Sequence, residues 1–98
     1  MKLTFTLAMV LCGTTLATRA WCKDDPAAGA KLYSANCTAC HGADRAGMPG
    51  AFPALTGINK RLQPAQIKEK IRKGGGLMPP FPQLSQQEID DIASYLAN

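Results

Sequence analysis

Apolar and polar residues alternate with a helical period near the end of the chain. Ser85 and Glu88, three residues apart, form the pattern of a capping box, which predicts that a helix begins just after Ser85. Four apolar residues follow at the spacing i, i+3, i+4 and i+7, which places them on one face of that helix. They are Ile89, Ile92, Ala93 and Leu96.

The same period predicts a helix from about Pro64 to Lys73. Ile67 and Ile71 are four residues apart, so they share one face of this helix. Gly74 follows as a residue that commonly ends a helix.

A further helix is predicted between Asp25 and Asn36. Asp25 is a favourable N-cap, and Pro26 suits the first helical position. The inner face is expected to carry Ala28, Leu32 and Ala35, with Tyr33 beside them.

The rest of the pattern indicates an all-α fold with long loops. No stretch alternates with the period of two that is typical of a strand. Residues 42–57 and 74–82 are rich in glycine and proline and have no lasting periodicity. Three short helices bury little apolar area in one another, and a loop as long as 42–57 is usually functional. We therefore expect another constituent to fill the middle of the fold.

The first 20 residues have the pattern of a secretory signal peptide. Lys2 precedes an uncharged apolar run that is too short to span a bilayer, and small residues follow it. Cleavage is expected after Ala20, with Ala17 as the alternative. The sequence thus predicts a signal peptide at 1–20 and one exported, periplasmic domain at 21–98 without a transmembrane anchor.

The charge of the mature chain is small. Loss of Lys2 and Arg19 with the signal peptide lowers the formal net charge from +4 to +2. Nucleic-acid binding requires a clustered basic face with stacking aromatic groups, so it has little support here.

The motif "CTACH", from Cys37 to His41, predicts the missing constituent. C-x-x-C-H is the attachment sequence of c-type haem: the two thiols add to two vinyl groups of the porphyrin, and the imidazole binds the iron. A thioredoxin-like site would need neighbouring strands, and a structural zinc site would need four Cys or His ligands. His41 is the only histidine in the sequence, and Cys22 is the only other cysteine of the mature chain.

Iron with His41 on one side needs a second axial ligand, and methionine is the usual one in cytochromes c. Met48 and Met78 occur in similar surroundings, "GMPGAFP" and "LMPPFP". Met48 follows His41 by only seven residues, whereas Met78 lies beyond a helix and its loop can reach the opposite face. We therefore expect Met78 to be the ligand, with an open or water-bound site as the alternative.

These motifs make the mature chain resemble the class I mono-haem c-type cytochromes in their short bacterial form. The resemblance runs from "GAKLYSANCTACHG" to "IDDIASYLAN". It implies that the first and last helices cross, with Gly29 near an aromatic residue such as Tyr95. It also implies that the carbonyl of Pro53, in "PALTG", accepts a hydrogen bond from the haem-ligating histidine. The chain departs from larger members by lacking a tryptophan in its middle. Weak candidates for contact with the haem propionates are Asn59, Lys60, Arg61 and Gln63.

The predicted function is that of a soluble periplasmic one-electron carrier with one covalent haem c, not an enzyme. Its partners would be redox proteins. Two alternatives stay open: a haem subunit of a periplasmic dehydrogenase or reductase complex, and a haem sensor or peroxidase with a labile sixth ligand. Once Cys37 and Cys40 hold the haem, Cys22 has no cysteine of the mature chain left to pair with. We therefore expect a monomer with a free or capped Cys22, or a Cys22-linked dimer.

Overall fold

The structure is a computed structural model that describes residues 24–98. The predicted signal peptide and Cys22 lie outside the described residues. Helices make up the regular structure of the described part, which has no strand and only two isolated β-bridges, so the all-α prediction is confirmed. The elements are α1 (Pro26–Asn36), α2 (Thr38–His41), the 3-10 helix η2 (Ile58–Lys60), α3 (Pro64–Lys73) and α4 (Gln86–Leu96).

The N-terminus of α1 is capped as predicted. The Asp25 carboxylate accepts hydrogen bonds from the backbone N–H groups of Ala27 and Ala28, and Pro26 occupies the first turn. The predicted inner face of this helix is confirmed in part: Tyr33 is buried and Leu32 packs against the core, but Ala35 is exposed and Gly29 is buried in its place.

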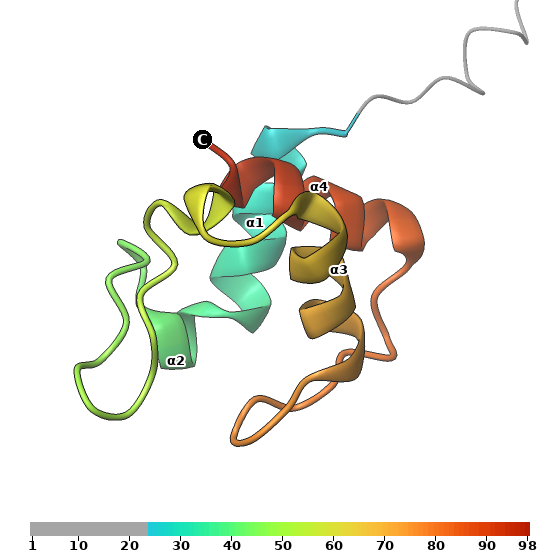
Figure 1. The fold of residues 1–98 in the computed structure, drawn as a ribbon. Helices are drawn as coiled ribbons and strands as arrows, with labels where there is room; N and C mark the ends of the chain where they lie inside the picture. Colours follow the sequence, from blue (N-terminus) through green and yellow to red (C-terminus); the bar gives the residue numbers. More distant parts are fainter. Residues whose placement is uncertain (1–23) are drawn as a thin grey trace, which may run out of the picture.

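The face is rotated because α1 crosses α4 at very short range. A Cβ atom at Gly29 would lie 1.9 Å from the main-chain oxygen of Asp91 and 2.9 Å from Cβ of Tyr95, so only glycine permits this approach. Beside the crossing, the rings of Tyr33 and Tyr95 pack with their centroids 5.4 Å apart. Figure 1 shows α4 passing over one end of α1, with α3 alongside.

The apolar faces predicted for α3 and α4 are confirmed. Ile67 and Ile71 of α3 are buried, and they belong to one cluster with the four predicted residues of α4. The capping box of α4 is present in both directions, between Ser85 and Glu88. The α1–α4 pair and α3 thus form a support from which two loops extend.

The two loops leave this support on the same side. One follows α2 and comprises residues 42–57, and the other follows α3 and comprises residues 74–82; in Figure 1 the first lies at the lower left, beside α2, and the second lies below α3. Within residues 24–98, no helix has the length and apolar character needed to cross a membrane.

Candidate functional site

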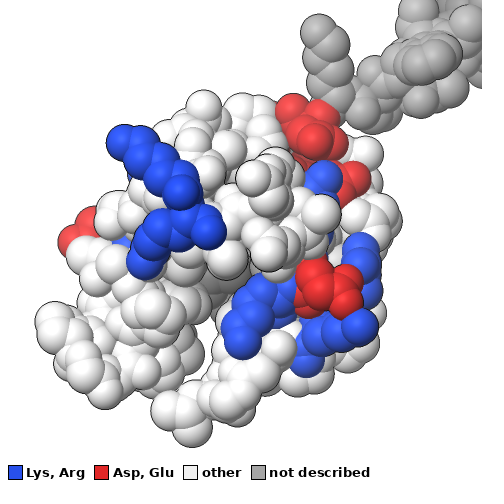
Figure 2. Space-filling model, in the orientation of Figure 1, with Lys and Arg blue, Asp and Glu red and all other residues white. Residues whose placement is uncertain are grey.

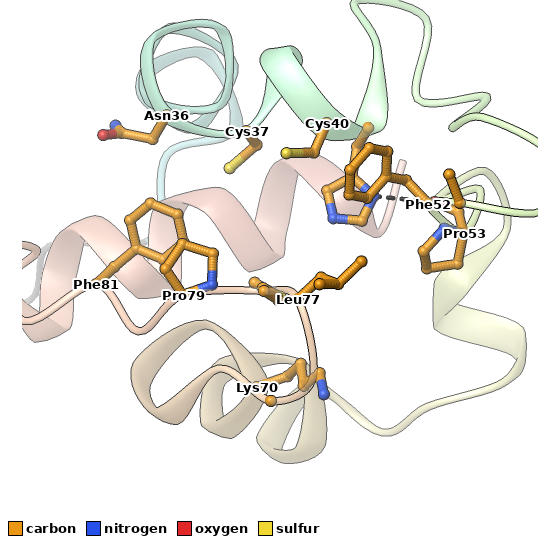
Figure 3. Close-up of a pocket in the computed structure, with 13 residues that line it drawn as sticks. Asn36, Cys37, Cys40, Phe52, Pro53, Lys70, Leu77, Pro79 and Phe81 are labelled. Carbon is orange, nitrogen blue, oxygen red and sulfur yellow. Dashed lines mark hydrogen bonds between the residues drawn. The ribbon is translucent and has the colours of Figure 1, made fainter.

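Cys37, Cys40 and His41 lie on one helical turn. Cys37 both ends α1 and begins α2: its N–H donates to the Tyr33 carbonyl at 2.8 Å, and its carbonyl accepts from His41 N–H at 3.0 Å. Residues three and four apart on a helix share a face. Figure 3 shows the sulfur atoms of Cys37 and Cys40 on the same side of α2, over a cleft that both residues line. Neither forms a disulfide.

The His41 ring is oriented by a single hydrogen bond. Nδ1 lies 2.9 Å from the carbonyl oxygen of Pro53, the dashed line in Figure 3. A carbonyl oxygen can only accept, so Nδ1–H is the donor, and Nε2 is the ring nitrogen left to bind a metal. The ring is 9% exposed and lines the cleft. His41 therefore offers Nε2 to a metal and makes the Pro53 contact that the resemblance implied.

Met78 lines the same cleft from the loop that follows α3. Gly75 and Met78 pair through two backbone hydrogen bonds of 2.9 and 3.0 Å, which closes the loop into a tight turn. Figure 3 shows its neighbours Leu77 and Pro79 across the cleft from Cys37 and Cys40. Met78 is half-buried and packs against the core.

Met48 lies differently, although its surroundings in the sequence are similar. Met48 and Phe52 pair through two backbone hydrogen bonds of 2.8 Å. Phe52 is the second residue of its pair, as Met78 is the second residue of the Gly75–Met78 pair, and a proline follows each of them. Phe52 also lines the cleft. Met48 does not line it and is 52% exposed. The structural counterpart of Met78 is thus Phe52.

The cleft has the lining of a site for a large apolar ligand. Its volume is about 260 Å³, and its walls are mostly apolar and aromatic, as is usual for ligand pockets. It deepens toward core residues such as Ile58, Ile71 and Ile92. Two free thiols, one imidazole nitrogen and one thioether open onto these apolar walls, and this set of groups fits a covalently held haem.

The same residues do not suit a zinc ion. A structural zinc site takes four Cys or His ligands, and among residues 24–98 the cleft is lined by Cys37, Cys40 and His41 alone of these types. Burial and the neighbouring Cys40 raise the pKa of the Cys37 thiol to about 11. Residues 24–98 also contain no group of three or more His, Cys, Asp or Glu side chains that could hold a metal ion.

The chain matches a family model described as "Cytochrome C oxidase, cbb3-type, subunit III" over residues 24–96. It is 33% identical over 97 residues to cytochrome c6 of Cyanidioschyzon merolae, covering 96% of this chain and 88% of that protein. It is 40% identical over 80 residues to cytochrome c-554(548) of Halomonas halodenitrificans, covering 76% and 95%.

The chain belongs to the class I c-type cytochromes. Cytochrome c-550 of Bacillus subtilis is also similar, 39% identical over 75 residues that cover 76% of this chain; the match spans only 60% of that longer relative. The fold matches the crystal structure of cytochrome c6 from the diatom Phaeodactylum tricornutum with a TM-score of 0.61 and 29% identity, over 74% of this chain and 91% of that one. This cytochrome therefore carries one covalent haem c and transfers electrons rather than catalysing a reaction of its own.

Residues proposed from the sequence as propionate contacts do not line the cleft of this cytochrome. Asn59 donates to the Ala97 carbonyl, and Arg61 donates to the Ala54 carbonyl at 2.8 Å. Among the described residues that line the cleft, Lys70 is the one charged side chain. Sequence reasoning missed it, because its position on α3 gave no signal other than membership of a basic run.

The two loop segments that flank the cleft are uncharged. Residues 46–59 and 74–87 contain no charged side chain, and Figure 2 shows their white lobes on either side of a hollow. Leu77 is 81% exposed on one of these lobes.

Part of the positive charge of α3 is offset by ion pairs within the helix. Lys73 and Arg72 both contact Glu69. The hydrogen bond and the charge of Lys73 lower the pKa of Glu69.

Proposed function

We propose that this cytochrome is a periplasmic one-electron carrier with the haem attached through Cys37 and Cys40 and its iron bound by His41 and Met78. One observation carries this proposal: the two free thiols and the His41 imidazole open onto one apolar cleft from the α2 turn, and the Met78 thioether opens onto it from the loop after α3. Met48, the other methionine of the predicted mature chain, lies outside that cleft.

The bound haem supplies the redox-active iron, and the side chains of the chain determine what that iron can do. With His41 and Met78 both bound, no coordination position is left for a substrate, so the chemistry is limited to outer-sphere electron transfer. The thioether of Met78 favours ferrous iron and raises the reduction potential. The apolar walls exclude water and favour the less charged redox state.

Electrons would pass at the mouth of the cleft, between the uncharged segments 46–59 and 74–87. The exposed side chain of Leu77 and the flanking lobes offer an apolar surface on which a redox protein can dock. Lys70, which lines the cleft, is a cation available there for an acidic partner. The periplasmic location is supported by the signal-peptide pattern at residues 1–20 and by the haem attachment motif.

A second candidate function is that of a haem subunit in a larger respiratory complex. The observation that favours it is the description of the matching family model, which names a subunit of a cbb3-type oxidase. A free carrier should purify alone at high salt, because its encounters with redox partners are transient and bury little surface. A subunit would remain with its complex under the same conditions.

The covalent attachment is tested by expressing the full chain with a haem-attachment system. The mature protein should have the mass of the chain plus one haem, and the haem should stay with the chain after denaturation. Replacing both Cys37 and Cys40 by serine should abolish this attachment. A preparation with two unmodified thiols and a metal other than haem iron would refute the proposal.

A further inference from the structure

Arg45 stands out in the loop after α2 because its backbone is in a conformation that side chains rarely adopt. Its φ is 64°, and among residues 24–98 it is the one non-glycine residue with a positive φ. Such a conformation is strained and persists only where the surrounding contacts hold it. The contacts of Arg45 show what holds it.

The guanidinium of Arg45 is fixed to the C-terminal end of α4. Its Cζ lies 4.9 Å from the centre of the Tyr95 ring, a cation–π contact. Nη1 donates to the main-chain oxygens of Asn98 at 2.9 Å and Tyr95 at 3.4 Å. Because Tyr95 also packs on Tyr33 at the α1–α4 crossing, Arg45 ties its loop to the most tightly packed part of the fold.

The backbone of Arg45 is fixed to the segment that follows Pro53. The carbonyl of Arg45 accepts hydrogen bonds from the N–H of Leu55 at 2.7 Å and of Thr56 at 3.3 Å. Leu55 is two residues beyond Pro53, whose carbonyl accepts from His41. From the other side, Arg61 donates to the carbonyl of Ala54.

We propose that Arg45 is a positioning residue that holds the Pro53 carbonyl against His41 Nδ1 and so sets the electron-donating strength of the histidine ligand. Its left-handed backbone turns its carbonyl to Leu55, while its side chain fixes the same residue to α4. This proposal rests on the proposed ligation of iron by His41.

The expected change in reduction potential has a defined sign. A short Nδ1–H···O bond makes the imidazole more basic, which stabilises ferric iron and lowers the potential. If the Pro53 carbonyl is held less firmly, its hydrogen bond with His41 Nδ1 weakens, and the reduction potential should therefore rise. Two trivial effects of losing Arg45 act in the opposite direction: removal of a positive charge favours ferric iron, and so does entry of water into the cleft.

The test compares variants of the holoprotein. Arg45→Gly keeps the backbone conformation and removes the guanidinium. Arg45→Lys keeps the charge but cannot reproduce the flat stacking contact with Tyr95. Arg72→Ala is the matched control, because it removes an arginine whose contacts are with Glu69 and Gln86, away from residues 42–57. The readouts are the reduction potential and the solvent exchange rate of the His41 Nδ1 proton, measured by NMR in the reduced state.

We expect Arg45→Gly to raise the potential and to accelerate exchange of the Nδ1 proton at least about tenfold, the equivalent of about 1.4 kcal/mol in opening. Arg45→Lys should give a smaller change of the same sign, and Arg72→Ala should leave the exchange rate unchanged.

A potential that falls or stays constant in Arg45→Gly, with unchanged exchange, overturns the proposal. If Arg45→Gly does not fold, Arg45→Lys provides the test: a higher potential with faster exchange supports the proposal, and a lower or constant potential with unchanged exchange overturns it. A wild-type protein without histidine ligation overturns both this inference and the proposed function, whereas normal ligation with insensitive Arg45 variants overturns this inference alone.

Discussion

A Cβ atom at Gly74 would lie 2.5 Å from the main-chain oxygen of Met78. Gly74 ends α3 with a φ of 68°, so the chain turns back on itself there and brings the Met78 turn against the helix end. Only glycine combines this φ with this approach. The end of α3 thus sets the position of the proposed sulfur ligand.

Gly74→Ala should therefore weaken the bond between Met78 and iron. The methyl group must displace the Met78 backbone, in addition to the cost of about 1 kcal/mol for alanine at positive φ. We expect a partial loss of the sulfur-to-iron absorption band and a lower midpoint of denaturation by guanidinium. Gly76→Ala is the matched control, because its φ is 59° but no atom lies within 4 Å of an added Cβ. Equal effects of the two substitutions on the band would contradict this account.

The crossing of α1 and α4 makes a second prediction. Helix propensity alone predicts that Gly29→Ala stabilises α1, by up to about 1 kcal/mol. The added methyl would meet the Asp91 backbone, and overpacking of this kind destabilises by about 1–3 kcal/mol or more. We expect net destabilisation in chemical denaturation of the holoprotein. Ala35→Gly on the exposed side of α1 is the reference, with an expected loss of about 0.5–1 kcal/mol from propensity alone. A more stable Gly29→Ala protein would show that the crossing is loose.

Tyr33 makes the stability depend on alkaline pH. Burial raises the pKa of Tyr33 to about 12, and its hydroxyl donates to the Gly42 carbonyl at 2.7 Å. An unfolded tyrosine loses its proton near pH 10, so above that pH the folded state holds more protons than the unfolded state. The free energy of unfolding should therefore fall as pH rises from about 10 to 12. In Tyr33→Phe this fall should be smaller, while stability at pH 7 should drop by about 0.5–1.5 kcal/mol for the lost hydrogen bond. An equal alkaline fall in both proteins would assign the effect to another group.

Local rules predicted the helices well because their ends depend on nearby residues. Asp25 and Ser85 cap α1 and α4 through contacts within three residues, and Gly74 ends α3. The haem attachment motif could be predicted equally well, because Cys37 to His41 form one turn of chain. The full inner face of α1 could not be predicted in this way, because it depends on the close approach of Gly29 to Asp91, a residue more than sixty positions away.

The loops were the least predictable part. The "MP" sequences around Met48 and Met78 are similar, and nothing in them indicated that the hydrogen-bond register makes Phe52 the structural counterpart of Met78. Arg45 gave no signal either, because its contacts with Tyr95 and Leu55 exist only after the helices have packed. These positions are set by tertiary contacts, which the sequence does not contain as a local pattern.

The ligation of iron by Met78 is tested most directly by the visible absorption spectrum of the oxidised protein in two methionine variants. Met78→Ala should abolish the sulfur-to-ferric-iron band in the red, lower the reduction potential and open the iron to carbon monoxide in the reduced state. Met48→Ala should keep the band and change stability by no more than about 0.5 kcal/mol, because Met48 is half exposed and outside the cleft. A band that disappears in Met48→Ala and persists in Met78→Ala, or that is absent from the wild-type protein, would contradict the proposed ligation.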